Sequence, residues 1–402
     1  MKKYTIAILG FGVVGSGVAD LLSKNRKEVE NAAKAVINIK YILDLRDFPD
    51  SPFSDRVIHD FNTIASDPEV DAIIEVMGGS HPAYEYTVTA LKAGKSVITS
   101  NKEVVAAFGD EFLRLAEENG VSYRFEAAVG GGIPVISPMI SCIRQNKVTE
   151  VRGILNGTTN YILTKMFKDG ESFEDALTDA QHRGYAESNP AADVMGTDAA
   201  RKITILTALA TGRLPDVAKV HTEGITAIRS ADVKAAESVG CGIKLLGRAK
   251  IYGDKSSVAV APFMISNDIP LSGVSDVYNA VEVIAEPLGN VMFYGRGAGA
   301  GPTASAVVGD IIMTVREGEC RVLPCFTKQA PKEENLFSTE SYRRYVAVSE
   351  DKRETAEGLF SVEKVIRTDG EYSFIADYIN ESDHAAALEK LGDGLLSSIR
   401  LL

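Results

Sequence analysis

The sequence predicts an α/β protein built on a doubly wound parallel sheet, followed by an α+β domain and a small C-terminal domain. Three observations lead to this fold class. Residues 1–150 alternate short β-branched runs with amphipathic stretches, the pattern of strands joined by helices in a parallel sheet. A glycine-rich turn separates the first such run from the stretch that follows it. From about residue 148, long helical segments replace the alternation.

Four apolar runs in residues 1–150 have the length and composition of strands. They are TIAILG at 5–10, INIKYIL at 37–43, AIIEVM at 72–77 and SVITS at 96–100. Between them lie helical stretches such as VVGSGVADLLSK and AYEYTVTALKAG, and Gly94 stops the second. We therefore expect a Rossmann-type sheet in this region.

The remaining chain is predicted to mix longer helices with strands. The helical segments are NYILTKMFKD, FEDALTDAQHRG and TDAARKITILTALATG, and a strand is expected at SVAVAPFMI. ILNGTTNYIL supplies Asn160 or the adjacent threonines as caps for the helix that follows. A polar stretch at 327–340 predicts a linker. The tail then predicts strand, short helix, strand, strand, helix and a last strand.

Composition narrows the function classes. The 402 residues carry a net charge of −12 and show no basic stripe, which argues against nucleic acid as a partner. The N-terminal MKKYTIAILGFGVVGSGVADLL resembles a signal peptide, but four glycines and Asp20 interrupt it. No run is long enough to span a bilayer, so we expect a cytoplasmic protein without a membrane partner. The four scattered cysteines are expected to be reduced thiols.

The turn GFGVVGSG at residues 10–17 predicts a dinucleotide site. It follows an apolar strand and opens a helix, which is the context that GxGxxG requires. Gly10 permits the tight turn, Gly12 lets the backbone approach a pyrophosphate, and Gly15 allows the helix to pack closely on the strand. The unpaired N–H groups at the helix N-terminus, after Phe11 and around Val13 and Val14, favour a bound phosphate.

The second strand ends in residues that leave the coenzyme open. Asp44 can accept a hydrogen bond from a ribose 2′-OH, which favours NAD, and Arg46 can neutralise a 2′-phosphate, which favours NADP. Both residues are present. The sequence predicts use of both coenzymes or of NADP, with Arg46 as the discriminating residue.

Charged residues next to apolar segments mark a candidate active site. Lys102 follows a strand at the carboxyl edge of the predicted sheet, where ligands bind. In GYAESNPAADVMGTDAARK at 184–202, Asp198 and Lys202 are four residues apart and share one face of a helix that begins at Thr197 or Asp198. Because ITILTALA is apolar all round, this helix should be buried and carry Lys202 into the domain.

These motifs resemble homoserine dehydrogenase. The pattern A-x3-G … N-P-x2-D-V-x-G-x-D-x3-K over residues 180–202 is similar to the signature of that family. The likeness extends over residues 1 to about 315, in the order of the family. It includes GFGVVGSG, SNK at 100–102, FEAAVGGGIPVISP at 125–138, ILNGTTNYIL at 154–163 and GRGAGAGPTASAV at 295–307.

The resemblance implies NAD(P)H-dependent reduction of L-aspartate 4-semialdehyde to L-homoserine, on the route to threonine, methionine and isoleucine. It implies that Glu187, Asp193 and Asp198 help to hold the amino acid, and that Lys102 and Lys202 lie at the reacting oxygen. Lys202 would polarise the aldehyde and deliver a proton while Asp198 keeps it in position. Lys102 would share this role or bridge cofactor and substrate.

Further cofactor and ion contacts follow from the same resemblance. Cofactor contacts are expected at Gly79, Ser100, Gly297 and Gly299, in addition to the first glycine-rich turn, Asp44, Arg46 and Lys102. The segment FEAAVGGGIP matches the family loop that binds sodium or potassium. Its ligands would be Glu126 and the backbone oxygens of Val129, Gly131 and Ile133.

The resemblance also implies a domain plan. Residues 1–150 would bind the dinucleotide, with 295–325 returning to that domain, and 151–294 would form the substrate-binding, catalytic and dimerisation domain. Residues 340–402 have the element order of an ACT domain, but SEDKRETAEG replaces the usual effector turn. We therefore favour a dimerisation role over amino-acid sensing for this tail, and expect a homodimer or homotetramer.

Two other functions are compatible with parts of the sequence. A non-catalytic NAD(P)-binding amino-acid sensor would share the fold, but it would not need two lysines at the hydride site. A phosphorylating aspartate-semialdehyde dehydrogenase needs an activated cysteine. Cys142 is the nearest candidate, and nothing basic is poised to lower the pKa of its thiol.

Overall fold

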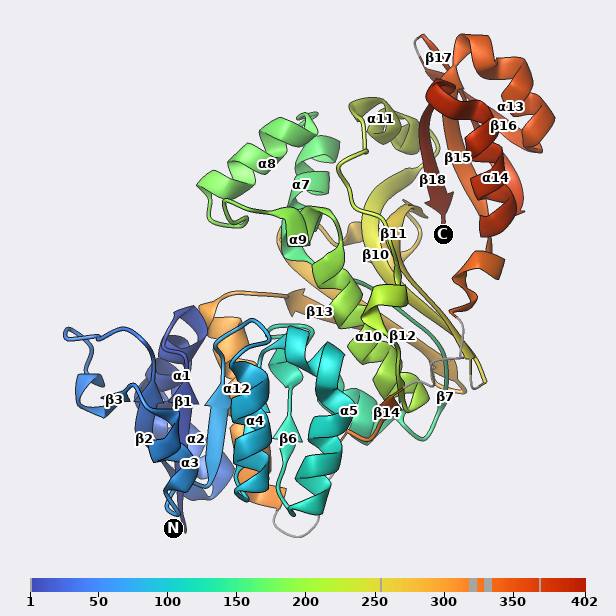
Figure 1. Cartoon of the computed structure of the whole chain (residues 1–402). Helices are drawn as coiled ribbons and strands as arrows, with labels where there is room; N and C mark the ends of the chain where they lie inside the picture. Colours follow the sequence, from blue (N-terminus) through green and yellow to red (C-terminus); the bar gives the residue numbers. More distant parts are fainter. Residues whose placement is uncertain (1, 254, 318–323, 329–334, 369) are drawn as a thin grey trace.

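The protein folds into two lobes, each built on its own large sheet (Figure 1). The structure, a computed structural model, describes residues 2–253, 255–317, 324–328, 335–368 and 370–402. Within these residues, the first sheet has six parallel strands, and the second is a mixed sheet that includes the last strand of the chain.

The first sheet has the strand order β3-β2-β1-β4-β5-β6, and every pairing in it is parallel. Its strands are β1 (Lys2–Leu9), β2 (Ala35–Leu43), β3 (Val57–Ile58), β4 (Ala72–Glu75), β5 (Ser96–Thr99) and β6 (Tyr123–Arg124). The predicted doubly wound parallel sheet is therefore confirmed, and the carboxyl ends of β1, β4 and β5 lie at one edge.

Helices cover both faces of this sheet. They are α1 (Val13–Lys24), α2 (Arg26–Ala33), α3 (Phe61–Ser66), α4 (Ala83–Lys92), α5 (Lys102–Glu118) and α12 (Ala300–Glu317). Alternate residues of β1 face opposite sides: Ile6 and Ile8 pack with α1 and α12, and Ala7 and Leu9 pack with α3, α4 and α5. The chain thus returns to the first lobe through α12, which packs on α1.

The second sheet, which we call the central sheet, has β13 at one edge and extends into the C-terminal part of the chain. Its order is β13-β12-β7-β10-β11-β18-β15-β17-β16, with β9 paired to β11. The strands of the middle part are β7 (Lys147–Ile154), β9 (His221–Thr222), β10 (Cys241–Tyr252), β11 (Lys255–Ser266), β12 (Tyr278–Glu286) and β13 (Gly289–Arg296). A small parallel pair joins β8 (Arg213–Leu214) to β14 (Thr327–Lys328).

Helices of the middle part position the charged residues singled out from the sequence. They are α6 (Ile136–Pro138), α7 (Gly157–Lys168), α8 (Phe173–His182), α9 (Ala191–Val194), α10 (Thr197–Thr211) and α11 (Ser230–Ser238). As predicted, α10 is buried, and its Ile203, Ile205 and Leu206 are fully enclosed. It packs on α5 of the first lobe and on β10 and β11 (Figure 1).

The C-terminal unit has the predicted order of strand, helix, strand, strand, helix and strand. Its elements are β15 (Ser341–Ser349), α13 (Arg353–Leu359), β16 (Val362–Thr368), β17 (Glu371–Asn380), α14 (Glu381–Leu391) and β18 (Leu395–Leu401). Strand β18 pairs in parallel with β11, so this unit extends the central sheet. The predicted domain boundaries stay predictions.

Some predictions differ from the structure or fall outside it. The cap of α7 is Asn156, whose side chain accepts the N–H of Thr159, so Asn160 lies inside the helix. The predicted linker and return segment each fall partly on residues outside the described ranges, at 329–334 and 318–323. Of the cysteines, Cys142, Cys241 and Cys325 are free thiols, and Cys320 lies outside the described residues.

Among the described residues, no helix combines the length and the apolarity that crossing a bilayer requires.

Candidate active site

Two lysines and one aspartate meet where the two lobes join. The Lys202 ammonium lies 2.7 Å from Asp198 Oδ2, and the Lys102 ammonium lies 2.9 Å from Asp198 Oδ1. Lys102 is the first residue of α5, whereas Asp198 and Lys202 are one turn apart on α10. The Asp198 carboxylate therefore bridges an amine from each lobe.

The three side chains differ in their access to solvent. Asp198 and Lys202 are 5% and 7% exposed, and the side chain of Lys102 is 39% exposed. Lys202 Nζ also donates to the carbonyl oxygen of Leu155 at 2.7 Å. This second bond holds the buried amine in one place, while Lys102 closes the cluster on its solvent side.

Asn156 connects the carboxylate of Asp193 to this cluster. Its Nδ2 donates to Asp193 Oδ1 at 2.7 Å and to Asp198 Oδ2 at 2.9 Å, and its Oδ1 accepts the N–H of Thr159. The residue that caps α7 thus sets the spacing of Asp193 and Asp198. Reasoning from the sequence missed Asn156, although an asparagine before G-T-T is a recognisable helix cap.

Burial and charge shift the pKa values of the cluster in opposite directions. Burial would raise the pKa of the Asp198 carboxyl, but the ammonium groups of Lys202 and Lys102 outweigh it and hold this pKa below its usual range. Burial lowers the pKa of Lys202, and the attraction of Asp198 offsets only part of this effect. Burial also raises the pKa of Asp193. Such opposed shifts are typical of acid–base sites.

Glu187 lies apart from the cluster in this structure. Its side chain is exposed on the segment between α8 and α9, and it forms no hydrogen bond or ion pair with any of the described residues. The carbonyl oxygen of Glu187 accepts a hydrogen bond from the Nε2 of Gln181. Of the five charged residues expected at the site, the structure brings together Lys102, Asp193, Asp198 and Lys202.

The turn between β1 and α1 has the geometry that a dinucleotide needs. Gly10 has a φ of +93°, which favours glycine, and a Cβ on Gly15 would lie 2.0 Å from the Gly10 carbonyl oxygen. A Cβ on Gly12 would meet none of the described residues within 4 Å, so the backbone there is open to a ligand. Val13, the first residue of α1, is exposed, and Val14 follows it. The residues present therefore fit a pyrophosphate at the helix N-terminus.

Asp44 and Arg46 form a pair beside this turn. Asp44 accepts the Phe11 N–H at 2.7 Å, and Arg46 Nε and Nη2 donate to its two oxygens at 3.0 and 3.1 Å. The hydrogen bond from the Arg46 guanidinium lowers the pKa of Asp44 to about 2. His59, which sequence reasoning did not single out, places Nδ1 2.7 Å from the Asp44 carbonyl oxygen.

The other expected cofactor residues lie after the carboxyl ends of β4 and β5 or on the segment before α12, which returns the chain to the first lobe. Gly79 follows β4, and its carbonyl oxygen accepts Asn101 Nδ2; Ser100 follows β5 directly. Gly297 and Gly299 precede α12, and a Cβ on Gly297 would lie 2.0 Å from Asn279 Nδ2. These positions stay predictions for cofactor contact.

The proposed cation loop has three backbone carbonyl oxygens that accept no hydrogen bond from the described residues. Among the described residues, no hydrogen bond ends on the carbonyl oxygens of Val129, Gly131 or Ile133, whereas Glu126 begins a 3₁₀ turn, Glu126–Ala128. The Glu126 carboxylate, by contrast, accepts three backbone N–H groups, those of residues 135, 136 and 137, at 2.7–2.8 Å. Within the described ranges, no group of three or more His, Cys, Asp or Glu side chains could hold a metal ion.

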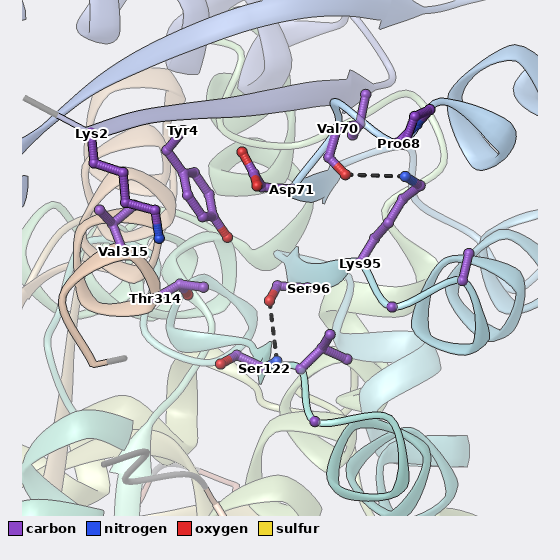
Figure 2. Close-up of a pocket in the computed structure, with 14 residues that line it drawn as sticks. Lys2, Tyr4, Pro68, Val70, Asp71, Lys95, Ser96, Ser122, Thr314 and Val315 are labelled. Atoms are coloured by element: carbon purple, nitrogen blue, oxygen red, sulfur yellow. Dashed lines mark hydrogen bonds between the residues drawn. The ribbon is translucent and has the colours of Figure 1, made fainter. Parts of the chain in front are cut away.

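A cavity of about 430 Å³ lies at the amino ends of the strands of the first sheet, opposite the predicted dinucleotide site (Figure 2). Tyr4, Asp71, Ser96 and Ser122 line it at the amino ends of the strands. The buried Lys95 ammonium there donates to two backbone carbonyl oxygens. Because open parallel sheets bind ligands at the carboxyl ends of their strands, this cavity is not the predicted dinucleotide site.

Comparison with known protein families identifies two matching regions. Residues 134–312 match a family model described as homoserine dehydrogenase, and residues 10–126 match the homoserine dehydrogenase NAD binding domain. A homoserine dehydrogenase of Bacillus subtilis is 34% identical over 98% of this chain and 96% of its own length. One from Synechocystis is 42% identical over 77% of this chain and 73% of its own length.

Solved structures agree with this assignment. A homoserine dehydrogenase from Thiobacillus denitrificans superposes with a TM-score of 0.91 at 31% identity, covering 100% of this chain and 99% of that one. A hyperthermophilic archaeal homoserine dehydrogenase mutant in complex with NADPH superposes with a TM-score of 0.67 at 28% identity, covering 78% and 97%. By sequence and by fold, the chain therefore belongs to the homoserine dehydrogenase family.

Proposed function

We propose that Asp198, Lys202 and Lys102 form the centre at which this NAD(P)-dependent oxidoreductase reduces L-aspartate 4-semialdehyde to L-homoserine. The observation that carries the proposal is the buried carboxylate of Asp198 held between two ammonium groups from different lobes. The dinucleotide, when bound, supplies the hydride for the carbonyl carbon. The protein has to supply the proton for the carbonyl oxygen.

Lys202 is the proposed proton donor, directly or through one water. Its ammonium is fixed by Asp198 and by the Leu155 carbonyl oxygen, so it can polarise an aldehyde oxygen without reorganising. Asp198 offsets part of the lowering of the Lys202 pKa that burial causes. Lys102 shares the acid–base role or bridges cofactor and substrate.

The substrate ammonium is assigned to the carboxylates. Asp193 lies next to Asp198 through Asn156 and is the best placed to accept it. Glu187 remains a proposed contact that rests on the family resemblance, because its side chain is exposed in this structure.

Oxidation of NADPH by the purified protein in the presence of L-aspartate 4-semialdehyde tests this function. Turnover that depends on the aldehyde supports it. NADPH binding without oxidation would instead support the alternative of a non-catalytic amino-acid sensor.

Coenzyme choice is proposed to depend on Arg46. Its guanidinium lies on the Asp44 carboxylate, so a 2′-phosphate can take over that charge-assisted contact. We expect Arg46→Leu to lower kcat/KM for NADPH about tenfold and to leave that for NADH within about twofold. Initial rates with each coenzyme measure this.

Arg114→Leu is the matched control, since it removes another exposed arginine that pairs with a carboxylate, on α5. A variant of Arg46 that loses activity equally with both coenzymes would contradict the assignment.

A monovalent cation is proposed at Glu126 and the backbone carbonyl oxygens of Val129, Gly131 and Ile133. The Glu126 carboxylate accepts three N–H groups in this structure, and its part in the site rests on the family resemblance. We expect replacement of sodium and potassium by a bulky organic cation to lower the melting temperature and the rate, with recovery when potassium is restored. Unchanged melting and rates would exclude the site.

A homodimer or homotetramer and a cytoplasmic location remain proposals. An interface is supported by β13, which among the described strands is an edge strand of the central sheet and exposes Met292 and Tyr294. An amino-acid effector at the C-terminal unit is the weaker alternative, since α13 has only seven residues.

A further inference from the structure

The turn between Asp193 and Asp198 rests on a short segment, residues 223–225. The Ile225 N–H donates to the Val194 carbonyl oxygen at 2.9 Å. A Cβ on Gly224 would lie 2.2 Å from that same oxygen, so the two backbones are in direct contact. Gly196, just before α10, also lies against this segment, since a Cβ there would lie 3.4 Å from the Glu223 carbonyl oxygen, in ordinary van der Waals contact. We call residues 223–225 the support segment.

Strand β18 holds the support segment through the side chain of Arg400. Arg400 on β18 places Nη1 and Nη2 each 2.7 Å from one oxygen of Glu223, a bidentate contact. Arg400 is 1% exposed and also contacts Glu381 through two bonds of 2.8 Å. The Glu223 N–H donates to Val260 on β11, the strand beside β18.

We propose that Arg400, through Glu223, is a positioning residue for the substrate-binding turn. This inference rests on the proposed function of Asp193 and Asp198. Fixing Glu223 fixes the backbone of Gly224 and Ile225, and these hold Val194 and Gly196 between the two carboxylates. Ordering of the substrate ammonium site therefore depends on a residue near the end of the chain, outside the dinucleotide-binding lobe.

A second ion pair, between Arg229 and Glu371, makes it possible to test whether Arg400 positions the turn or only attaches the C-terminal unit. Arg229, next to α11, contacts Glu371 on β17 at 2.7 Å, so it also joins this unit to the middle part of the chain. Among the described residues, no hydrogen bond or ion pair links the side chains of Arg229 or Glu371 to residues 223–225. Loss of this pair weakens attachment without releasing the support segment.

Steady-state rates of Glu223→Gln, Arg400→Met and the double variant, at saturating NADPH, test the proposal, with Glu371→Gln as the matched control. For both single variants we expect KM for L-aspartate 4-semialdehyde to rise about tenfold while the Kd for NADPH is unchanged. The double variant should be no worse than the more affected single variant. Glu371→Gln should keep KM within about twofold.

An equal rise of KM in Glu371→Gln, or an unchanged KM in Glu223→Gln, would overturn the proposal. If Arg400→Met does not fold, Arg400→Lys keeps the charge and removes the bidentate contact, and its KM decides. An inactive wild-type protein would instead refute the proposed function, so the two failures are distinct.

Discussion

Replacement of Lys202 by methionine is expected to lower kcat for aldehyde reduction about 10³-fold while NADPH binding is retained. Methionine fills a similar volume, but it removes the ammonium that contacts Asp198 Oδ2 and the Leu155 carbonyl oxygen. The developing oxyanion then loses its fixed positive partner and its proton donor. Asp198 keeps one cation, Lys102, which limits the cost of the uncompensated carboxylate.

Single-turnover oxidation of NADPH measures the chemical step, and the emission of NADPH itself measures its binding, since the chain has no tryptophan. Lys244→Met is the matched control, because it removes another buried lysine whose ammonium contacts Asn160 Oδ1 and the Val274 carbonyl oxygen. Burial lowers the pKa of Lys244 to about 8. Near-normal turnover of Lys202→Met would refute its role.

Features that depend on local chemistry could be predicted from the sequence. The turn at residues 10–17 requires glycine at positions where a side chain would strike the backbone, and the structure shows such contacts at Gly15. The burial of Lys202 followed from the apolar residues after it on α10, since a helix that is apolar all round has no solvent face. Both features are confined to fewer than twenty neighbouring residues.

Features that depend on distant contacts could not be predicted. Asn156 bridges Asp193 and Asp198 across more than thirty residues, and its position in a capping motif gives no sign of this second role. The pairing of β18 with β11 joins Arg400 to Phe263, which no local pattern indicates. Helix α2 was missed because it is mostly polar and buries only Val29 and Ala33.

The second large effect is expected for Asp198→Asn, which should lower kcat/KM for the aldehyde about 10²-fold at neutral pH. The amide leaves two ammonium groups facing each other without the carboxylate between them. Burial already lowers the pKa of Lys202, and loss of Asp198 lowers it further. Since a proton donor must be protonated, the rate falls as the pH rises through this pKa. The fall should therefore begin at a lower pH in the variant.

The pH dependence of kcat/KM in Asp198→Asn and in Lys102→Met tests this account, because the alkaline fall in rate should move in opposite directions in the two variants. Lys102 is a like charge that lowers the pKa of Lys202, so its removal should raise that pKa. The alkaline fall in rate should then move to higher pH in Lys102→Met and to lower pH in Asp198→Asn. Shifts in the same direction, or no shift in either variant, would mean that the titrating donor is a group other than Lys202.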